Sequence, residues 1–171
     1  KDVKALINIS KENNYLPKLI SAVEDVNFNQ KKILFKKVIS HFGENLKDKK
    51  IAIWGLSFKP ETDDMREAPS IPLINSLIEA GAVVNAYDPQ AINEAKFYLK
   101  GLDVKYFDNK YNALENVDAL ILVTEWKEFR SPDFKRILKL MNTNVFIDGR
   151  NQFNCNQMKE QGFNYSQIGV K

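Results

Sequence analysis

Cationic and aromatic side chains recur in this sequence after short apolar runs. Cations neutralise phosphate groups, and aromatic rings offer flat surfaces on which a base or a sugar can stack. An arginine can also hold phosphate or ribose oxygens in a fixed fork. Together these side chains are what a site for a nucleoside diphosphate requires. The residues concerned are Phe58, Lys59, Arg66, Trp126, Lys127 and Arg150.

The first apolar run, residues 51–54, ends at Gly55 and leads into a loop that carries Phe58 and Lys59. Ligands of open α/β sheets bind beyond the carboxyl ends of the strands, so this loop is well placed to meet an anion. It is not the dinucleotide fingerprint G-x-G-x-x-G, because Ser57 and Pro60 stand where that motif has glycine. We therefore expect no orthodox NAD site in this part of the chain.

Apolar runs alternate with helical patterns along residues 47–171, which predicts a parallel sheet in a doubly wound, Rossmann-like α/β domain. The expected strand order is 3-2-1-4-5-6. Strands are predicted at residues 51–54, 83–87, 104–107, 119–123, 145–147 and 165–168. Helices are predicted around residues 71–79, 92–99, 111–114, 134–141 and 157–161.

This strand order makes strands one, four and five neighbours, with their carboxyl ends at the same edge of the sheet. Three loops, residues 55–60, 124–127 and 148–151, are therefore expected to lie together there. Their cations and aromatic rings would form one site for a phosphate-bearing ligand.

Each of these residues also has a structural interpretation. Lys59 can be a solvated surface lysine, and Phe58 and Trp126 can be core or lid residues. Asp88, after the second strand, stands where such folds place a ribose-binding acid, but without the glycine fingerprint a turn or helix-cap role is favoured. Asp148 can orient Arg150 or cap a turn.

Composition narrows the class of protein. A net charge of +3, with lysines interleaved among acids, argues against nucleic acid. The single cysteine, Cys155, excludes an intrachain disulfide and suits a reducing, cytoplasmic location. No apolar run reaches the ~18 residues of a membrane span.

The acids Glu61, Asp63 and Asp64 can neutralise Arg66 as a surface network, and we expect no metal site.

Residues 1–46 have the pattern of helices. Apolar residues from Lys18 to Phe42 recur at helical spacing, which predicts one helix of about 40 Å. Because its apolar residues lie on more than one side, it is expected to pack against another body. We interpret residues 1–46 as a linking and dimerisation segment, and residues 47–171 as the nucleotide-binding domain.

The sequence resembles the carboxy-terminal part of the UDP-glucose/GDP-mannose dehydrogenase family, above all its bacterial members that oxidise UDP-glucose. The resemblance covers essentially the whole chain. The matching stretches are KDVKAL at 1–6, GLSFKPETDDMRE at 55–67, AYDP at 86–89, VTEWKEFR at 123–130 and FIDGRN at 146–151.

The resemblance implies an NAD-dependent enzyme that forms UDP-glucuronate, a precursor in polysaccharide biosynthesis, through two oxidations of UDP-glucose. An amino-terminal domain would hold NAD, and a long helix would join two subunits. Phe58 and Lys59 are expected to contact the substrate, Arg150 its nucleotide, and Arg66 and Lys1 the NAD.

The family's nucleophilic cysteine would lie just before Lys1, so the chain is expected to contain no catalytic residue of its own and to be inactive alone. Two alternatives remain open. The sugar nucleotide can be UDP-N-acetylmannosamine or GDP-mannose, or the chain can be a free-standing nucleotide-binding or dimerisation module.

Overall fold

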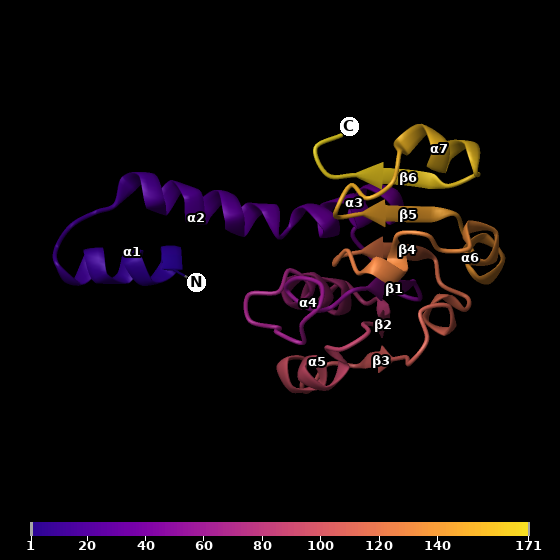
Figure 1. The fold of residues 1–171 in the computed structure, drawn as a ribbon, viewed down its shortest axis with the longest axis horizontal. Helices are drawn as coiled ribbons and strands as arrows, with labels where there is room; N and C mark the ends of the chain where they lie inside the picture. Colours follow the sequence, from indigo (N-terminus) through magenta and orange to yellow (C-terminus); the bar gives the residue numbers. More distant parts are fainter. Residues whose placement is uncertain (1, 171) are drawn as a thin grey trace. The chain divides into compact units, whose positions relative to one another are not determined.

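The computed structural model describes residues 2–170, and contacts within the chain divide it into two units between Ile33 and Leu34. The first unit is a pair of helices, and the second contains a parallel sheet with helices on both faces (Figure 1). None of the helices within the described residues is both long and apolar enough to cross a bilayer.

The helical unit consists of α1 (Asp2–Glu12) and α2 (Lys18–Gln30), which contact each other. Between them the chain turns at Asn14, whose φ of +57° is one that asparagine tolerates. Helix α2 buries none of its residues, and Leu19 is 80% exposed. Because helices in proteins owe most of their stability to packing of an apolar face, α2 gains little from this unit alone.

The apolar spacing predicts one helix from Lys18 to Phe42, but the structure interrupts it. Helix α2 ends at Gln30, and α3 (Ile33–Phe42) begins after a turn at residues 31–32. The turn amides bond to the carbonyls of Asn27 and Asn29. Asparagine is a poor helix former, so two of them in the last turn of α2 favour an end there.

The sheet unit contains six parallel strands in the order β3-β2-β1-β4-β5-β6, which confirms the predicted fold class and strand order (Figure 1). The strands are β1 (Lys50–Trp54), β2 (Val83–Tyr87), β3 (Val104–Tyr106), β4 (Ala119–Leu122), β5 (Val145–Asp148) and β6 (Asn164–Gln167).

The side chains of each central strand alternate between the two faces of the sheet and feed two separate cores. On β1, Ile51 and Ile53 face a core of aliphatic residues from α3, α4 and α5. Ala52 and Trp54 face a second core that is rich in aromatic residues. The remaining helices are α4 (Ser70–Glu79), α5 (Ile92–Tyr98), α6 (Phe134–Leu140) and α7 (Cys155–Glu160), with 3-10 turns η1 (Asn112–Leu114) and η2 (Lys127–Phe129).

Helix α3 belongs to the sheet unit, because Leu34 and Val38 are buried in its aliphatic core. The division between compact units therefore precedes the boundary expected between residues 46 and 47. The role of residues 1–46 in linking and dimerisation stays a prediction.

Candidate site at the carboxyl edge of the sheet

Two of the three predicted loops touch at Gly55. This glycine has a φ of +89°, and a Cβ placed on it would lie 2.6 Å from the backbone nitrogen of Thr124. The Thr124 hydroxyl in turn donates a 2.6 Å hydrogen bond to the carbonyl of Ser57. Glycine is required here because any side chain would separate the loop after β1 from the loop after β4.

The third loop joins the second in the same way. The amide of Gly149 donates a 2.8 Å hydrogen bond to the Leu122 carbonyl at the end of β4. A Cβ on Gly149 would lie 2.7 Å from that carbonyl oxygen and 3.0 Å from Leu34 of α3. The loops after β1, β4 and β5 are therefore packed side by side, as the strand order predicts.

A buried aspartate, Asp88, holds the first two loops in place. One carboxylate oxygen accepts hydrogen bonds from the loop after β1, the shortest at 2.7 Å, and from the Trp126 indole at 3.1 Å. The other oxygen accepts the two amides that follow β2. The turn role favoured for Asp88 is confirmed. The donors are the amides of Leu56, Ser57, Gln90 and Ala91, the Ser57 hydroxyl and the Trp126 indole.

A second buried aspartate, Asp148, holds the third loop in place. Its carboxylate accepts the amides of Arg150 at 2.8 Å and Gln152 at 2.7 Å, and the Tyr165 hydroxyl at 2.5 Å. Burial and this hydrogen bond raise the pKa of Tyr165 well above its ordinary value, so the phenol stays a proton donor. Asp148 thus fixes the backbone on which Arg150 stands.

The side chains predicted to contact a ligand have different environments. Lys59 is exposed, and the Phe58 ring is 47% exposed at the same loop. The loop is closed by a 2.8 Å hydrogen bond from the Phe58 amide to the Asp64 carbonyl. Trp126, in contrast, is only 4% exposed and belongs to the aromatic core. Of the two aromatic residues, Phe58 offers an open surface and Trp126 does not.

Two cations of the site pair with carboxylates. The Arg150 Nε lies 2.5 Å from Glu125 Oε2, in a pair of which both side chains are about one-third exposed. Lys127 lies 3.9 Å from Glu61, and both side chains are largely exposed. An exposed ion pair with this N–O distance contributes little to the stability of the fold. The sequence reasoning did not single out Glu125, although its place in the loop after β4 was the available signal.

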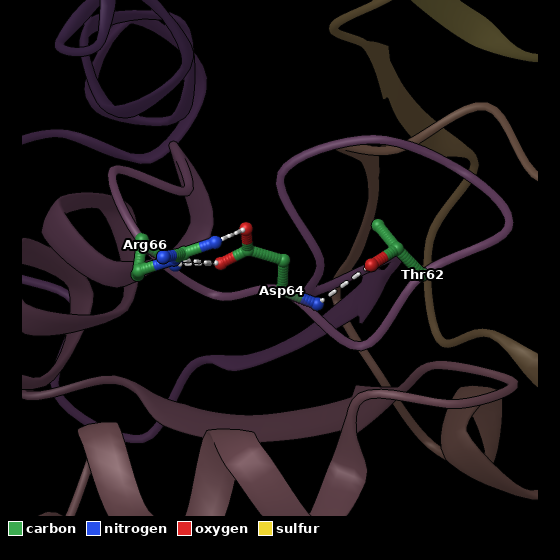
Figure 2. Close-up of polar contacts among 3 residues, drawn as sticks. All are labelled: Thr62, Asp64 and Arg66. Carbon is green, nitrogen blue, oxygen red and sulfur yellow. Dashed lines mark hydrogen bonds and ion pairs between the residues drawn. The ribbon is translucent and has the colours of Figure 1, made fainter. Parts of the chain in front are cut away.

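Arg66 occupies a different place from Lys59 and Arg150. Its guanidinium donates three hydrogen bonds to the Asp64 carboxylate, of 2.9, 3.1 and 2.6 Å, and the Asp64 amide donates to the Thr62 hydroxyl (Figure 2). The bond to Asp64 and the charge of that carboxylate raise the pKa of Arg66 above its ordinary value. Of the three acids expected to neutralise Arg66, Asp64 pairs with it, whereas Glu61 pairs with Lys127.

Arg66 and Asp64 line a cavity of about 400 Å³ together with Glu94 and Tyr98 of α5. Neither Lys59 nor Arg150 lines this cavity. Lys1, the other predicted NAD contact, lies outside the described residues. Residues 2–170 contain no group of three or more His, Cys, Asp or Glu side chains that is arranged to hold a metal ion.

Comparisons with known proteins indicate the family of the chain. The UDP binding domain of the UDP-glucose/GDP-mannose dehydrogenase family matches residues 52–155. The chain is 42% identical to the UDP-glucose 6-dehydrogenase of Pseudomonas aeruginosa, over 99% of this chain and 38% of that protein. It is 39% identical to UDP-glucose 6-dehydrogenase TuaD of Bacillus subtilis, over 99% of this chain and 36% of that protein.

Solved structures show the same fold. A UDP-glucose dehydrogenase from Pyrobaculum islandicum superposes with a TM-score of 0.79 at 26% identity, over 96% of this chain and 35% of that one. An NDP-N-acetyl-D-galactosaminuronic acid dehydrogenase from Methanosarcina mazei gives a TM-score of 0.80 at 24% identity, over 100% of this chain and 37% of that one. The chain thus spans well under half the length of the relatives that it matches.

Proposed function

The chain belongs to the UDP-glucose/GDP-mannose dehydrogenase family, and we propose that it serves as the UDP-sugar-binding part of an NAD-dependent enzyme that oxidises UDP-glucose to UDP-glucuronate. The observation that carries the proposal is the match of residues 52–155 to the UDP binding domain, combined with the three adjoining loops. Relatives at 38–42% identity are named UDP-glucose 6-dehydrogenase, which favours UDP-glucose over UDP-N-acetylmannosamine or GDP-mannose. The single cysteine suits the cytoplasm.

We propose that Phe58, Lys59 and Arg150 contact the UDP-sugar. Within residues 2–170, the Lys59 ammonium has no ion pair, so its charge is available to a phosphate. Arg150 uses Nε to pair with Glu125, and its two terminal nitrogens have no hydrogen bond among these residues, which leaves them for the nucleotide. The half-open Phe58 ring provides a flat apolar surface beside Lys59.

We assign Arg66 and Lys1 to contacts with NAD, which would be held mainly by a domain outside this chain. NAD supplies the acceptor for hydride. The contribution of this chain would be a guanidinium that Asp64 orients before the cofactor arrives. Because three of the cavity's lining residues are acids, Arg66 alone would not hold a dinucleotide.

The substrate assignment predicts that UDP and UDP-glucose bind the 171-residue chain in a calorimetric titration, and that GDP-mannose and NAD do not. Lys59→Ala and Arg150→Ala each remove a charge-assisted hydrogen bond, and each is expected to weaken UDP binding about tenfold or more. Lys47→Ala, at an exposed lysine before β1, is the control and should leave affinity unchanged. UDP affinity that is equal in all three variants would show that these residues do not form the site.

We propose that the isolated chain has no dehydrogenase activity. Cys155 is its one cysteine, and it begins α7 instead of standing on the loops of the site. Incubation of the chain with UDP-glucose and NAD is therefore expected to produce no NADH above a blank without protein, followed at the absorbance of the reduced nicotinamide. Steady NADH formation that depends on UDP-glucose would contradict the proposal.

We further propose that α1 and α2 form a dimer interface. On α2, Leu19, Val23 and Val26 recur at helical spacing and are 80%, 45% and 65% exposed. Val26→Glu should place a charge in this interface and shift the dimer to monomer in sedimentation velocity. Ser21→Glu adds the same charge on the side of α2 opposite these three residues and should leave the dimer intact. A wild-type chain that stays monomeric at every concentration would refute the interface.

A further inference from the structure

A cavity of about 200 Å³ lies among α3, α7 and β6 of the sheet unit. The cavity is lined by Lys37 and Ser40 from α3, Cys155 and Lys159 from α7, and Ser166 and Gln167 from β6. None of the lining residues within 2–170 is acidic. None of the residues assigned to the UDP-sugar lines it. It has room for several water molecules, since one occupies about 30 Å³ of liquid.

The polar groups of this cavity are only partly satisfied. Lys37 Nζ donates a 3.2 Å hydrogen bond to the Val170 carbonyl, and an ammonium has three donors. Within residues 2–170, Lys159 makes no hydrogen bond or ion pair with its side chain. The Ser166 hydroxyl oxygen is buried and has no hydrogen-bond partner in this part of the chain. Buried hydroxyl groups are normally hydrogen-bonded, so Ser166 indicates a missing partner.

The chemistry of the lining selects the kind of ligand. Two lysines on different helices give the cavity a positive charge, which no carboxylate among the described lining residues neutralises. Hydroxyl and amide groups beside them can donate to further oxygens. We propose that the cavity binds a small oxyanion of the phosphate class, as free phosphate or as a phosphate monoester, held between Lys37 of α3 and Lys159 of α7.

Cys155 provides a direct test, because it lines the cavity and is the only cysteine of the chain. The rate at which neutral iodoacetamide alkylates Cys155 in the 171-residue chain is measured with inorganic phosphate, or with glucose 1-phosphate, against sodium chloride at equal ionic strength and pH. Bound anion should shield the thiol, so the rate falls about tenfold at a ligand concentration of about nine times Kd. The ligand that protects at the lower concentration identifies free phosphate or a monoester.

Matched variants separate a specific site from a general salt effect. Lys37→Gln and Lys159→Gln should each raise the anion concentration needed for protection about tenfold, because each removes a charge-assisted contact. Lys36→Gln, at the exposed neighbour that does not line the cavity, should leave protection unchanged. Equal alkylation rates in phosphate, glucose 1-phosphate and chloride would overturn the proposal, as would protection that is undiminished in both cavity variants.

Discussion

Replacing Asp88 by asparagine should destabilise the sheet unit by about 3 kcal/mol or more. The substitution keeps the size of the side chain, so it leaves no cavity. It replaces one of the two carboxylate oxygens by an NH₂ group, so the backbone amides that bonded to that oxygen lose their acceptor and face a second donor. Each buried donor left without an acceptor costs about 1–3 kcal/mol.

Urea unfolding followed by tryptophan fluorescence measures the loss of stability in the sheet unit. The chain has two tryptophans, Trp54 and Trp126, and both are buried in the aromatic core of the sheet. Asp88→Asn should lower the urea concentration at the unfolding midpoint, with little change in the dependence of the unfolding free energy on urea. Asp103→Asn, at an exposed aspartate before β3, is the control and should stay within about 0.5 kcal/mol of the parent. Equal midpoints for the two variants would mean that Asp88 does not hold the loops.

Replacing Gly55 by alanine should separate the first two loops of the site. Its Cβ would lie 2.6 Å from the Thr124 backbone nitrogen and 2.8 Å from the Thr124 carbonyl oxygen, and backbone on both sides must move. The φ of +89° adds roughly 1–2 kcal/mol for a residue with a side chain. We expect Gly55→Ala to lose more stability than strain alone explains, and to weaken UDP binding because Lys59 moves with its loop.

Gly101 offers a matched control for the strain. It has the same φ of +89°, but a Cβ there would meet no described heavy atom within 4 Å apart from those of Gly101 and its chain neighbours. Gly101→Ala should therefore cost the strain alone and leave UDP binding unchanged. The difference in unfolding free energy between the two alanine variants isolates the contact of Gly55 with Thr124. If both variants lose the same stability and bind UDP equally, that close contact does not shape the site.

The sheet could be predicted from the sequence because buried parallel strands give short apolar runs bounded by turn residues. The runs at β1, β2, β4 and β5 are of this kind, and the doubly wound fold class with right-handed crossovers then indicated the strand order. The prediction that the loops after β1, β4 and β5 lie together needed only that strand order. The interruption between α2 and α3 was missed, because the apolar residues on either side of residues 31–32 recur at helical spacing, and only the local hydrogen bonding shows the break.

Individual side chains of the site were harder to predict. Phe58 and Trp126 both follow buried strands, and nothing local tells an open ring from a buried one. Trp126 is buried because its indole reaches Asp88, which lies 38 positions away in the sequence. The pairing of Arg150 with Glu125 likewise joins two strands' loops, so only the folded sheet reveals it.

The most direct test of the proposed function is a titration of the ¹⁵N-labelled chain with UDP, followed by the chemical shifts of the backbone amides. Binding at the carboxyl edge predicts the largest shift changes in residues 55–60 and 148–152, with smaller ones in residues 124–127. Amides of the cavity among α3, α7 and β6 should change far less. Shift changes confined to residues outside the three loops, or no change at millimolar UDP, would contradict a UDP-sugar site formed by these loops.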